Sequence, residues 1–250
     1  MKLHFIHLSD IHIRINWEED QGVVISSFVS DIKKQVEHLD VKSVYVVFSG
    51  DLVLAGDDPK LYDIFLKAFD NALDSIGITK EQRICVPGNH DISRSWIRDN
   101  KLNHDGILLQ SLTEKQFNDY VSSSSFLLAE KFENYRRFEQ SFSSFGINST
   151  TLTGMGWTLK EDVGVYCLNS AIFSSGESTS DFGNLAVDTR SIHKWITSCT
   201  SKYKVMVMHH PLSWLNHWAQ KELELILKKN FCLLLSGHEH DQQVDHSNSS

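Results

Sequence analysis

Aspartate, histidine and asparagine residues follow apolar, strand-like runs at five separate places in this sequence: "LSDIH", "FSGDL", "VPGNHD", "MHHP" and "LSGHEHD". Two of these places carry the spacing Asp-x-His or His-x-His. Residues two apart in an extended segment point to the same side, so both side chains could reach one centre. Neutral imidazoles and carboxylates suit Zn, Mn or Fe, and no cysteine takes part.

Seven side chains in these segments are candidate metal ligands: Asp10, His12, Asp51, Asn89, His209, His238 and His240. One zinc ion needs about four ligands, so this set predicts two ions that share a carboxylate. Asp51 is the expected bridge because it stands alone between the two groups. His210 is an alternative to His209 as a ligand, and Asp91 either positions its loop or is an exposed turn residue. A single Gly-Asp or Gly-Asn pair is usually only a turn, so the prediction rests on all five segments together.

The elements that would position these residues alternate between short apolar runs and helical patterns. Strands are expected at 2–8, 43–48, 82–86, 163–169, 204–208 and 231–235, with helices at about 18–39, 59–76, 188–199 and 218–229. This order predicts an α/β fold in which helices cover the sheet. Ligands of such sheets bind outside the carboxyl ends of the strands, where the five polar segments would converge.

The middle of the chain, from 94 to about 150, is expected to be a helical insertion in one domain that spans residues 1–250. Apolar residues at steps of three and four, including Leu128, Phe132, Tyr135 and Phe142, form one helical stripe. This stripe either packs on its own domain or belongs to a cap that shapes a pocket or a dimer surface. The run of serines at 122–125 is expected to break the helices. A further segment or domain is expected after residue 250.

The composition limits the classes of partner. A net charge of -8 and a pI near 5.9 argue against a broad nucleic-acid surface, so a phosphate ligand would need locally concentrated positive charge such as bound metal. We find no basic and apolar leader and no apolar run of membrane-spanning length, which favours a soluble protein with no membrane partner. The four cysteines lie far apart without a CxxC pair, which predicts buried thiols in a reducing, cytoplasmic compartment.

The order DxH, GD, GNHD, HH and GHxH, from Asp10 to His240, resembles the calcineurin-like metallophosphoesterase superfamily. The resemblance implies a two-layer β-sandwich flanked by helices, two divalent metal ions and hydrolysis of phosphoric esters. It implies that one ion is held by Asp10, His12, Asp51 and His240, and the other by Asp51, Asn89, His209 and His238. His90 would then bind phosphate beside Asn89 and protonate the leaving oxygen.

The sequence of the loop after the second strand indicates which branch of the superfamily this chain resembles. Ser/Thr protein phosphatases carry GDxVDRG there, whereas this chain has "GDLVLAG", with Leu54 and Ala55 in place of Asp and Arg. The loop and the helix after it are more similar to the cyclic nucleotide phosphodiesterase-like branch. We therefore expect hydrolysis of a phosphodiester in a nucleotide or nucleic acid. The alternatives are a nuclease effector joined to a C-terminal sensor or regulatory domain, and a catalytically idle binding domain.

Several residues near the motifs remain open to two interpretations. Trp214, His217 and Trp218 follow a ligand candidate and would either line the pocket and stack a base, or pack in the core or an interface. Arg14 would contact substrate or be solvated. Asn169 would reach the site or cap a turn.

Overall fold

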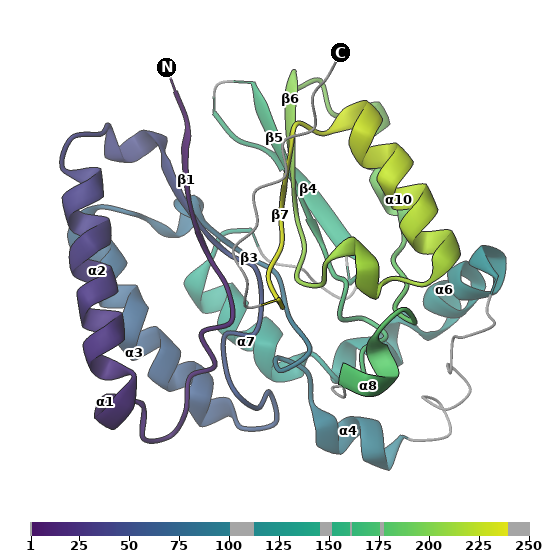
Figure 1. The fold of residues 1–250 in the computed structure, drawn as a ribbon, viewed down its shortest axis with the longest axis horizontal. Helices are drawn as coiled ribbons and strands as arrows, with labels where there is room; N and C mark the ends of the chain where they lie inside the picture. The colour runs from purple at the N-terminus through teal and green to yellow at the C-terminus, as the bar shows by residue number, and fades with distance from the viewer. Residues whose placement is uncertain (1, 101–112, 146–151, 161, 176–177, 240–250) are drawn as a thin grey trace.

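Two β-sheets lie face to face in the computed structural model, which describes residues 2–100, 113–145, 152–160, 162–175 and 178–239 (Figure 1). The first sheet is parallel and has the order β1 (His4–Leu8), β2 (Val44–Phe48), β3 (Arg83–Cys85). The second has the order β4 (Gly154–Thr158), β5 (Val163–Leu168), β6 (Tyr203–Val207), β7 (Leu233–Leu235). Only β4 runs antiparallel to its neighbour within these two sheets.

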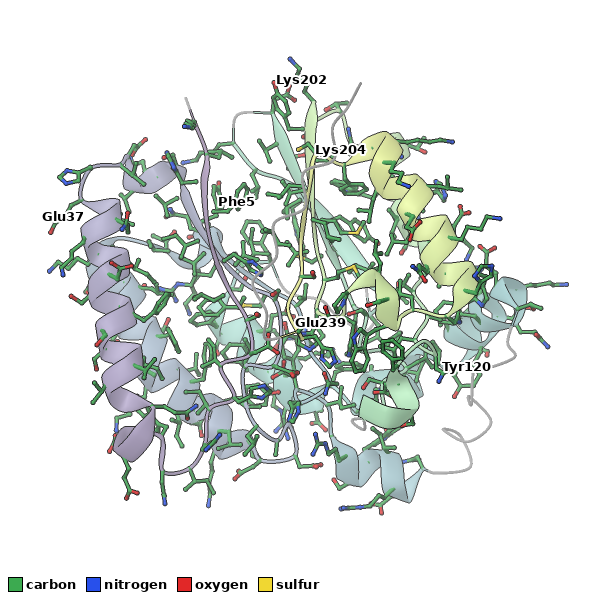
Figure 2. All side chains as sticks on the ribbon, in the orientation of Figure 1. Phe5, Glu37, Tyr120, Lys202, Lys204 and Glu239 are labelled. Atoms are coloured by element: carbon green, nitrogen blue, oxygen red, sulfur yellow. The ribbon has the colours of Figure 1, made fainter. Side chains whose placement is uncertain are left out.

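Side-chain alternation along the strands explains why two layers form. In β2, Tyr45 and Val47 pack between the two sheets, whereas Val44, Val46 and Phe48 face the helices on the other side. The strand is buried along its whole length because both of its faces are covered. Val165 and Cys167 of β5 meet the same central layer from the second sheet. Figure 2 shows how side chains fill this layer, with the labelled Phe5 packed against it.

Helices cover both outer faces of the sandwich. The first sheet is covered by α2 (Gly22–Val36), α3 (Pro59–Ile76) and α7 (Glu133–Phe142), with α1 (Trp17–Asp20) at the end of α2. The second sheet is covered by α6 (Glu114–Glu130), α9 (Thr189–Ser198) and α10 (His217–Asn230). Short elements complete the chain: α4 (Arg94–Asp99), α8 (Ser178–Asp181), η1 (Val41–Ser43), η2 (Lys80–Gln82) and η4 (Leu212–Trp214).

Local chemistry sets the ends of α3, the helix that follows the "GDLVLAG" loop. Asp58 accepts a hydrogen bond from the backbone N–H of Lys60, and Pro59 occupies the first turn, where its missing N–H costs nothing. Gly77 ends the helix at a φ of 88°, a left-handed conformation that a glycine adopts without strain. The predicted helix at 59–76 is therefore confirmed at both ends.

The middle of the chain contributes to both outer cores. Phe117 and Leu128 of α6 pack under the second sheet, whereas Tyr135 and Phe142 of α7 pack under the first. The predicted break at residues 122–125 is wrong, because α6 runs through these serines. A capping box at Thr113 starts α6 and buried apolar residues flank the serines, so tertiary packing outweighs their low helix propensity.

One strand was not predicted, and the prediction of four buried cysteines needs correction. Strand β4 was not expected, since "GMGWT" carries two glycines and no apolar run. Its Gly156 is required by packing, because a Cβ there would collide with the indole of Trp195. Cys85 and Cys167 are buried free thiols as predicted, but Cys199 is only partly buried and Cys232 is exposed, so the prediction is wrong for these two. Among the described residues, no helix has the length and apolar character needed to cross a bilayer.

Candidate metal centre

The loops that leave β1, β2, β3, β6 and β7 meet at one edge of the sandwich. Backbone hydrogen bonds join the first two loops, from Asp10 N to the Gly50 carbonyl (3.1 Å) and from His12 N to the Asp51 carbonyl (3.0 Å). The last loop joins them through the backbone N–H of His238, which donates to Asp10 Oδ2 at 2.9 Å. Segments far apart in sequence are therefore fixed against one another before any ligand binds.

Four of these residues adopt a left-handed backbone conformation. Positive φ angles occur at Asp10 (57°), His12 (49°), Asp51 (53°) and His238 (73°), and among the described non-glycine residues only Asp162 shares this property. Such conformations are uncommon for residues with a side chain, and they cluster at functional sites. The strain aims each side chain into the space between the loops.

Asp51 lies at the centre of the cluster and is almost completely buried. Its Oδ2 lies 3.8 Å from His12 Nε2 and 3.4 Å from His209 Nε2, while Oδ1 accepts a hydrogen bond from the backbone N–H of His90 at 2.8 Å. Candidate ligand atoms within 4.8 Å of one another form one group with His12 and His90, and a second group with Asp10 and His209. Asp51 belongs to both groups, but the groups do not reproduce the two expected ligand sets, because His12 is grouped with His90 and Asp10 with His209.

His209 and His210 have different surroundings. Both are fully buried, but His209 Nδ1 lies 2.8 Å from the Ser49 carbonyl, so Nε2 is directed at Asn89 Oδ1 and His238 Nδ1, each 3.1 Å away. His210 Nδ1 instead lies 3.0 Å from the Ser170 hydroxyl. The structure therefore places His209, rather than His210, in contact with Asp51 and Asn89. His210 still lies close enough to form a third group with His209 and His238.

The electrostatics of the cluster favour the cation-binding protonation state of Asp51 and His238 but not that of His209. Burial opposes the charge on Asp51, but His209 and His90 outweigh it and hold the pKa of that carboxyl below its ordinary value. Burial and the charge of His209 lower the pKa of His238 to about 4, so this imidazole is neutral. Burial disfavours charge on His209 as well, but Asp51 outweighs it and raises the pKa of His209 to about 9. A cation bound there would therefore displace a proton from His209.

Asp91 is a buried structural residue and not an exposed turn aspartate. Its carboxylate accepts hydrogen bonds from the backbone N–H groups of Leu52 (3.1 Å), Val53 (3.3 Å) and Gly88 (2.9 Å). These donors belong to the loops that carry Asp51 and His90. Burial and the nearby charge of Asp51 raise the pKa of Asp91 to about 7. Asp91 thus ties the second loop to the third.

His90 is oriented by groups that sequence patterns could not identify. Its Nδ1 lies 2.8 Å from the backbone carbonyl of Leu54, which can only accept a hydrogen bond, so Nδ1 carries the hydrogen; Arg94 Nη2, 3.3 Å away, is then a neighbour of Nδ1 and not its hydrogen-bond donor. The Leu54 side chain cannot accept a hydrogen bond, but the carbonyl of the same residue can. Because a carbonyl is common to all residues, no sequence signal marks this contact. Arg94 gave no signal because it follows the last motif residue by several positions.

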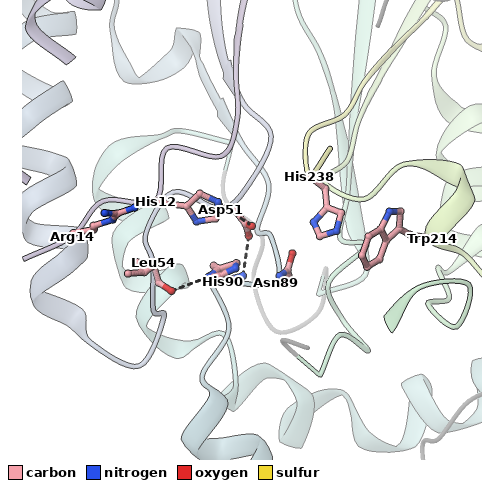
Figure 3. Close-up of a pocket in the computed structure, with 8 residues that line it drawn as sticks. All are labelled: His12, Arg14, Asp51, Leu54, Asn89, His90, Trp214 and His238. Atoms are coloured by element: carbon pink, nitrogen blue, oxygen red, sulfur yellow. Dashed lines mark hydrogen bonds and ion pairs between the residues drawn. The ribbon is translucent and has the colours of Figure 1, made fainter. Parts of the chain in front are cut away.

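A pocket of about 380 Å³ opens over the cluster, and eight residues line it: His12, Arg14, Asp51, Leu54, Asn89, His90, Trp214 and His238 (Figure 3). Arg14 and Trp214 lie at opposite ends, with the acidic and imidazole groups between them. Trp218 instead packs on Phe117 in the core, and Asn169 caps a turn by accepting from the Ala171 N–H. His240 lies outside the described residues.

The residues present fit a divalent cation. Asp10 Oδ1 is buried and accepts no hydrogen bond within the described part of the chain, which is costly unless a positive charge lies beside it. Imidazole, carboxylate and amide oxygen donors surround the same space, without a thiolate. This donor set suits Zn, Mn or Fe.

Comparison with known proteins identifies the family of the chain. The family described as "Calcineurin-like phosphoesterase" matches residues 3–242. The chain is also 24% identical over 253 aligned positions to an "Uncharacterized metallophosphoesterase-like protein YydB" of Bacillus subtilis (strain 168), an alignment that covers 98% of this chain and 50% of that protein. The chain thus spans about half the length of this relative. The two helix-flanked sheets, the shared aspartate and the family match over nearly the whole chain lead to one conclusion: this chain belongs to the calcineurin-like phosphoesterase family.

Proposed function

We propose that this chain hydrolyses a phosphodiester of a nucleotide or nucleic acid with the help of two divalent metal ions. The observation that carries the proposal is the position of Asp51, whose carboxylate belongs to two groups of candidate ligands at once. Asp10, His12 and Asp51, completed by His240, would hold one ion, and Asp51, Asn89, His209 and His238 the other. When bound, such ions polarise a phosphoryl group and lower the pKa of a water molecule.

The protein's own residues supply orientation and a proton. The Leu54 carbonyl accepts a hydrogen bond from protonated His90 Nδ1, which leaves Nε2 as the nitrogen that donates a proton to the departing ester oxygen. The backbone N–H of His90 is held by Asp51, so the acid and the bridging carboxylate keep a fixed relative position. The Asn89 side chain, directed at His209 through its oxygen, retains its amide N–H groups for a phosphate oxygen.

The "GDLVLAG" loop favours a diester over a phosphoprotein. Leu54 lines the pocket and is 40% exposed, in place of the Asp of the protein phosphatase motif, and Ala55 stands in place of the Arg that clamps phosphate there. A phosphomonoester has one more negative charge than a diester and gains more from a guanidinium clamp. An apolar side chain at this position suits the diester better. The cytoplasmic location and a regulatory domain after residue 250 stay predictions.

The test compares bis-p-nitrophenyl phosphate with p-nitrophenyl phosphate, using purified protein of measured metal content in the presence of Mn. We expect faster hydrolysis of the diester. Asp51→Asn should lower metal occupancy and rate together, whereas His90→Ala should keep the metal and lose most turnover. His193→Ala, which alters an exposed histidine paired with Glu222 on α9 and α10, is the control and should change neither.

Two outcomes would contradict this function. Protein that carries two metals per chain but hydrolyses neither ester would favour a binding domain. Full activity of His90→Ala on an ester with a poor leaving group would refute the role of His90 as the acid. A panel of single-stranded DNA and cyclic nucleotides then separates a nuclease from a nucleotide phosphodiesterase.

A further inference from the structure

An exposed phenylalanine lies beside the aromatic end of the pocket. Phe182 is 58% exposed, and its ring meets Trp214 edge to face with the ring centroids 5.3 Å apart. Trp214 lines the pocket itself, and its ring centroid lies only 3.9 Å from that of His238. Trp214 lies at one end of the pocket (Figure 3), and Phe182, which does not itself line the pocket, packs against the Trp214 ring; the two rings form an aromatic wall beside the candidate metal centre.

The backbone holds this wall in place. Leu185 N donates to the Trp214 carbonyl at 3.1 Å, and Asn216 N donates to the Leu185 carbonyl at 2.7 Å. These bonds attach the segment after Phe182 to the loop that follows β6. Asp181, next to Phe182, is buried and accepts from the backbone N–H of Ser175 at 2.9 Å. A wall fixed on both sides can bind a flat ligand without a large loss of conformational entropy.

Core packing does not account for Phe182. The residue takes no part in the buried clusters of the described chain, and most of its ring is in contact with water. An exposed aromatic side chain is unremarkable on a remote surface, but this one adjoins a pocket that contains Asp51 and His90. A substrate whose phosphate reaches these residues would bring its neighbouring group against the wall.

We propose that Phe182 and Trp214 form a subsite for the nucleobase of the phosphodiester substrate, in which the base stacks on Phe182, and Trp214, whose ring is at 85° to that of Phe182, faces the edge of the base. The inference rests on the proposed function and names the group that the substrate carries next to its phosphate. Stacking of a base on an aromatic side chain contributes about 1–3 kcal/mol, which corresponds to about a 5- to 150-fold effect on binding. The base can be of any type, since every base has a π face.

The kinetic test uses two diesters with the same leaving group. Thymidine 5′-(p-nitrophenyl) phosphate carries a base, and methyl p-nitrophenyl phosphate does not. Phe182→Ala should lower kcat/KM for the thymidine ester by about 5- to 150-fold and change that for the methyl ester by less than about twofold. Phe182→Tyr keeps the ring and should retain the preference, while Phe182→Leu keeps apolar volume alone and should lose it. Tyr203→Ala, which removes another exposed aromatic ring on β6, is the control and should change neither substrate.

A binding measurement separates the failure of this subsite from the failure of the proposed function. Calorimetric titration of the Mn-loaded protein compares thymidine 5′-monophosphate with methyl phosphate. Tighter binding of the nucleotide that is lost in Phe182→Ala supports the subsite, even if neither ester is hydrolysed. Hydrolysis of both esters with equal kcat/KM, unchanged in Phe182→Ala, overturns the subsite and leaves the phosphodiesterase function intact. Equal binding of the two ligands by wild-type protein also overturns it.

Discussion

Removal of the Asp91 carboxylate should loosen the metal centre although this residue is not a candidate ligand. Its two oxygens accept from three buried backbone N–H groups, those of Leu52, Val53 and Gly88. A buried N–H without an acceptor costs about 1–3 kcal/mol, so loss of all three costs about 3–9 kcal/mol. Water can enter the vacated space, and we therefore expect Asp91→Ala to lower the free energy of unfolding by about 3–5 kcal/mol.

Asp91→Asn is the milder and more informative change. The amide keeps one oxygen, but its NH₂ group meets an N–H donor, most directly that of Gly88, which bonds to Oδ2. One unsatisfied donor predicts a loss of about 1–3 kcal/mol. Because the same hydrogen bonds align Asp51 with His90, metal affinity should fall by about 10- to 100-fold, as it does when residues that orient ligands are altered.

Urea denaturation in the presence of a chelator measures the loss of stability without metal, and a separate metal titration measures affinity. The control is Asp58→Asn at the start of α3, where the side chain accepts from Lys60 N and Asn caps a helix as well as Asp does. It should leave both quantities unchanged. Wild-type stability and metal affinity in Asp91→Asn would refute the role assigned to this carboxylate.

Three further predictions address other parts of the fold. Gly88→Ala should lower metal occupancy, measured by metal analysis, because a Cβ would collide with the Asp51 carboxylate; Gly22→Ala on α2 meets only ordinary contacts and should not. The combined change Asp70→Asn and Asp74→Asn removes both carboxylates bound to the fully buried Arg83. It should lower the free energy of unfolding, measured by urea denaturation, by about 3–5 kcal/mol, which is more than the sum of the losses in the two single variants. Burial lowers the pKa of Lys131 from 10.5 to about 7, against the opposing effect of Asp181. Between these pH values the unfolded chain binds the extra proton, so wild-type stability should rise relative to Lys131→Met by about 1.4 kcal/mol per pH unit; a flat difference would contradict this.

The sequence identified the strand ends because their signals are local. A short apolar run followed by Asp or His needs no distant information, and the family's motif order supplied the relation between the segments. Strand β4 was not predicted because its glycines, Gly154 and Gly156, are required by contacts with residues distant in sequence. For Gly156 this contact is with the Trp195 indole. The helix through Ser122 to Ser125 was missed for a similar reason, since its stability comes from packing on both sides of the serines.

The candidate site shows the same difference between residues with a local sequence signal and contacts that depend on the fold. The residue type alone shows whether a side chain could bind metal, so Asp10, Asp51 and His209 could be proposed as ligands from the sequence. Groups that orient them do not: the carbonyl of Leu54 faces His90, and the carbonyl of Ser49 faces His209. Backbone atoms become specific only through the fold, which is why the orienting contacts required the structure.

The hydrogen bonds between the loops of the site hold its residues in their strained backbone conformations. A left-handed conformation costs an ordinary residue roughly 1–2 kcal/mol, and four such residues lie in this cluster. Left alone, each loop would relax to a more common conformation and turn its side chain away. The bond from His12 N to the Asp51 carbonyl, and that from His238 N to Asp10, hold strained residues directly, and Asp91 holds the segment after Asp51. The side chains are thus oriented by contacts within the protein, so a cation that binds there does not have to organise the loops itself.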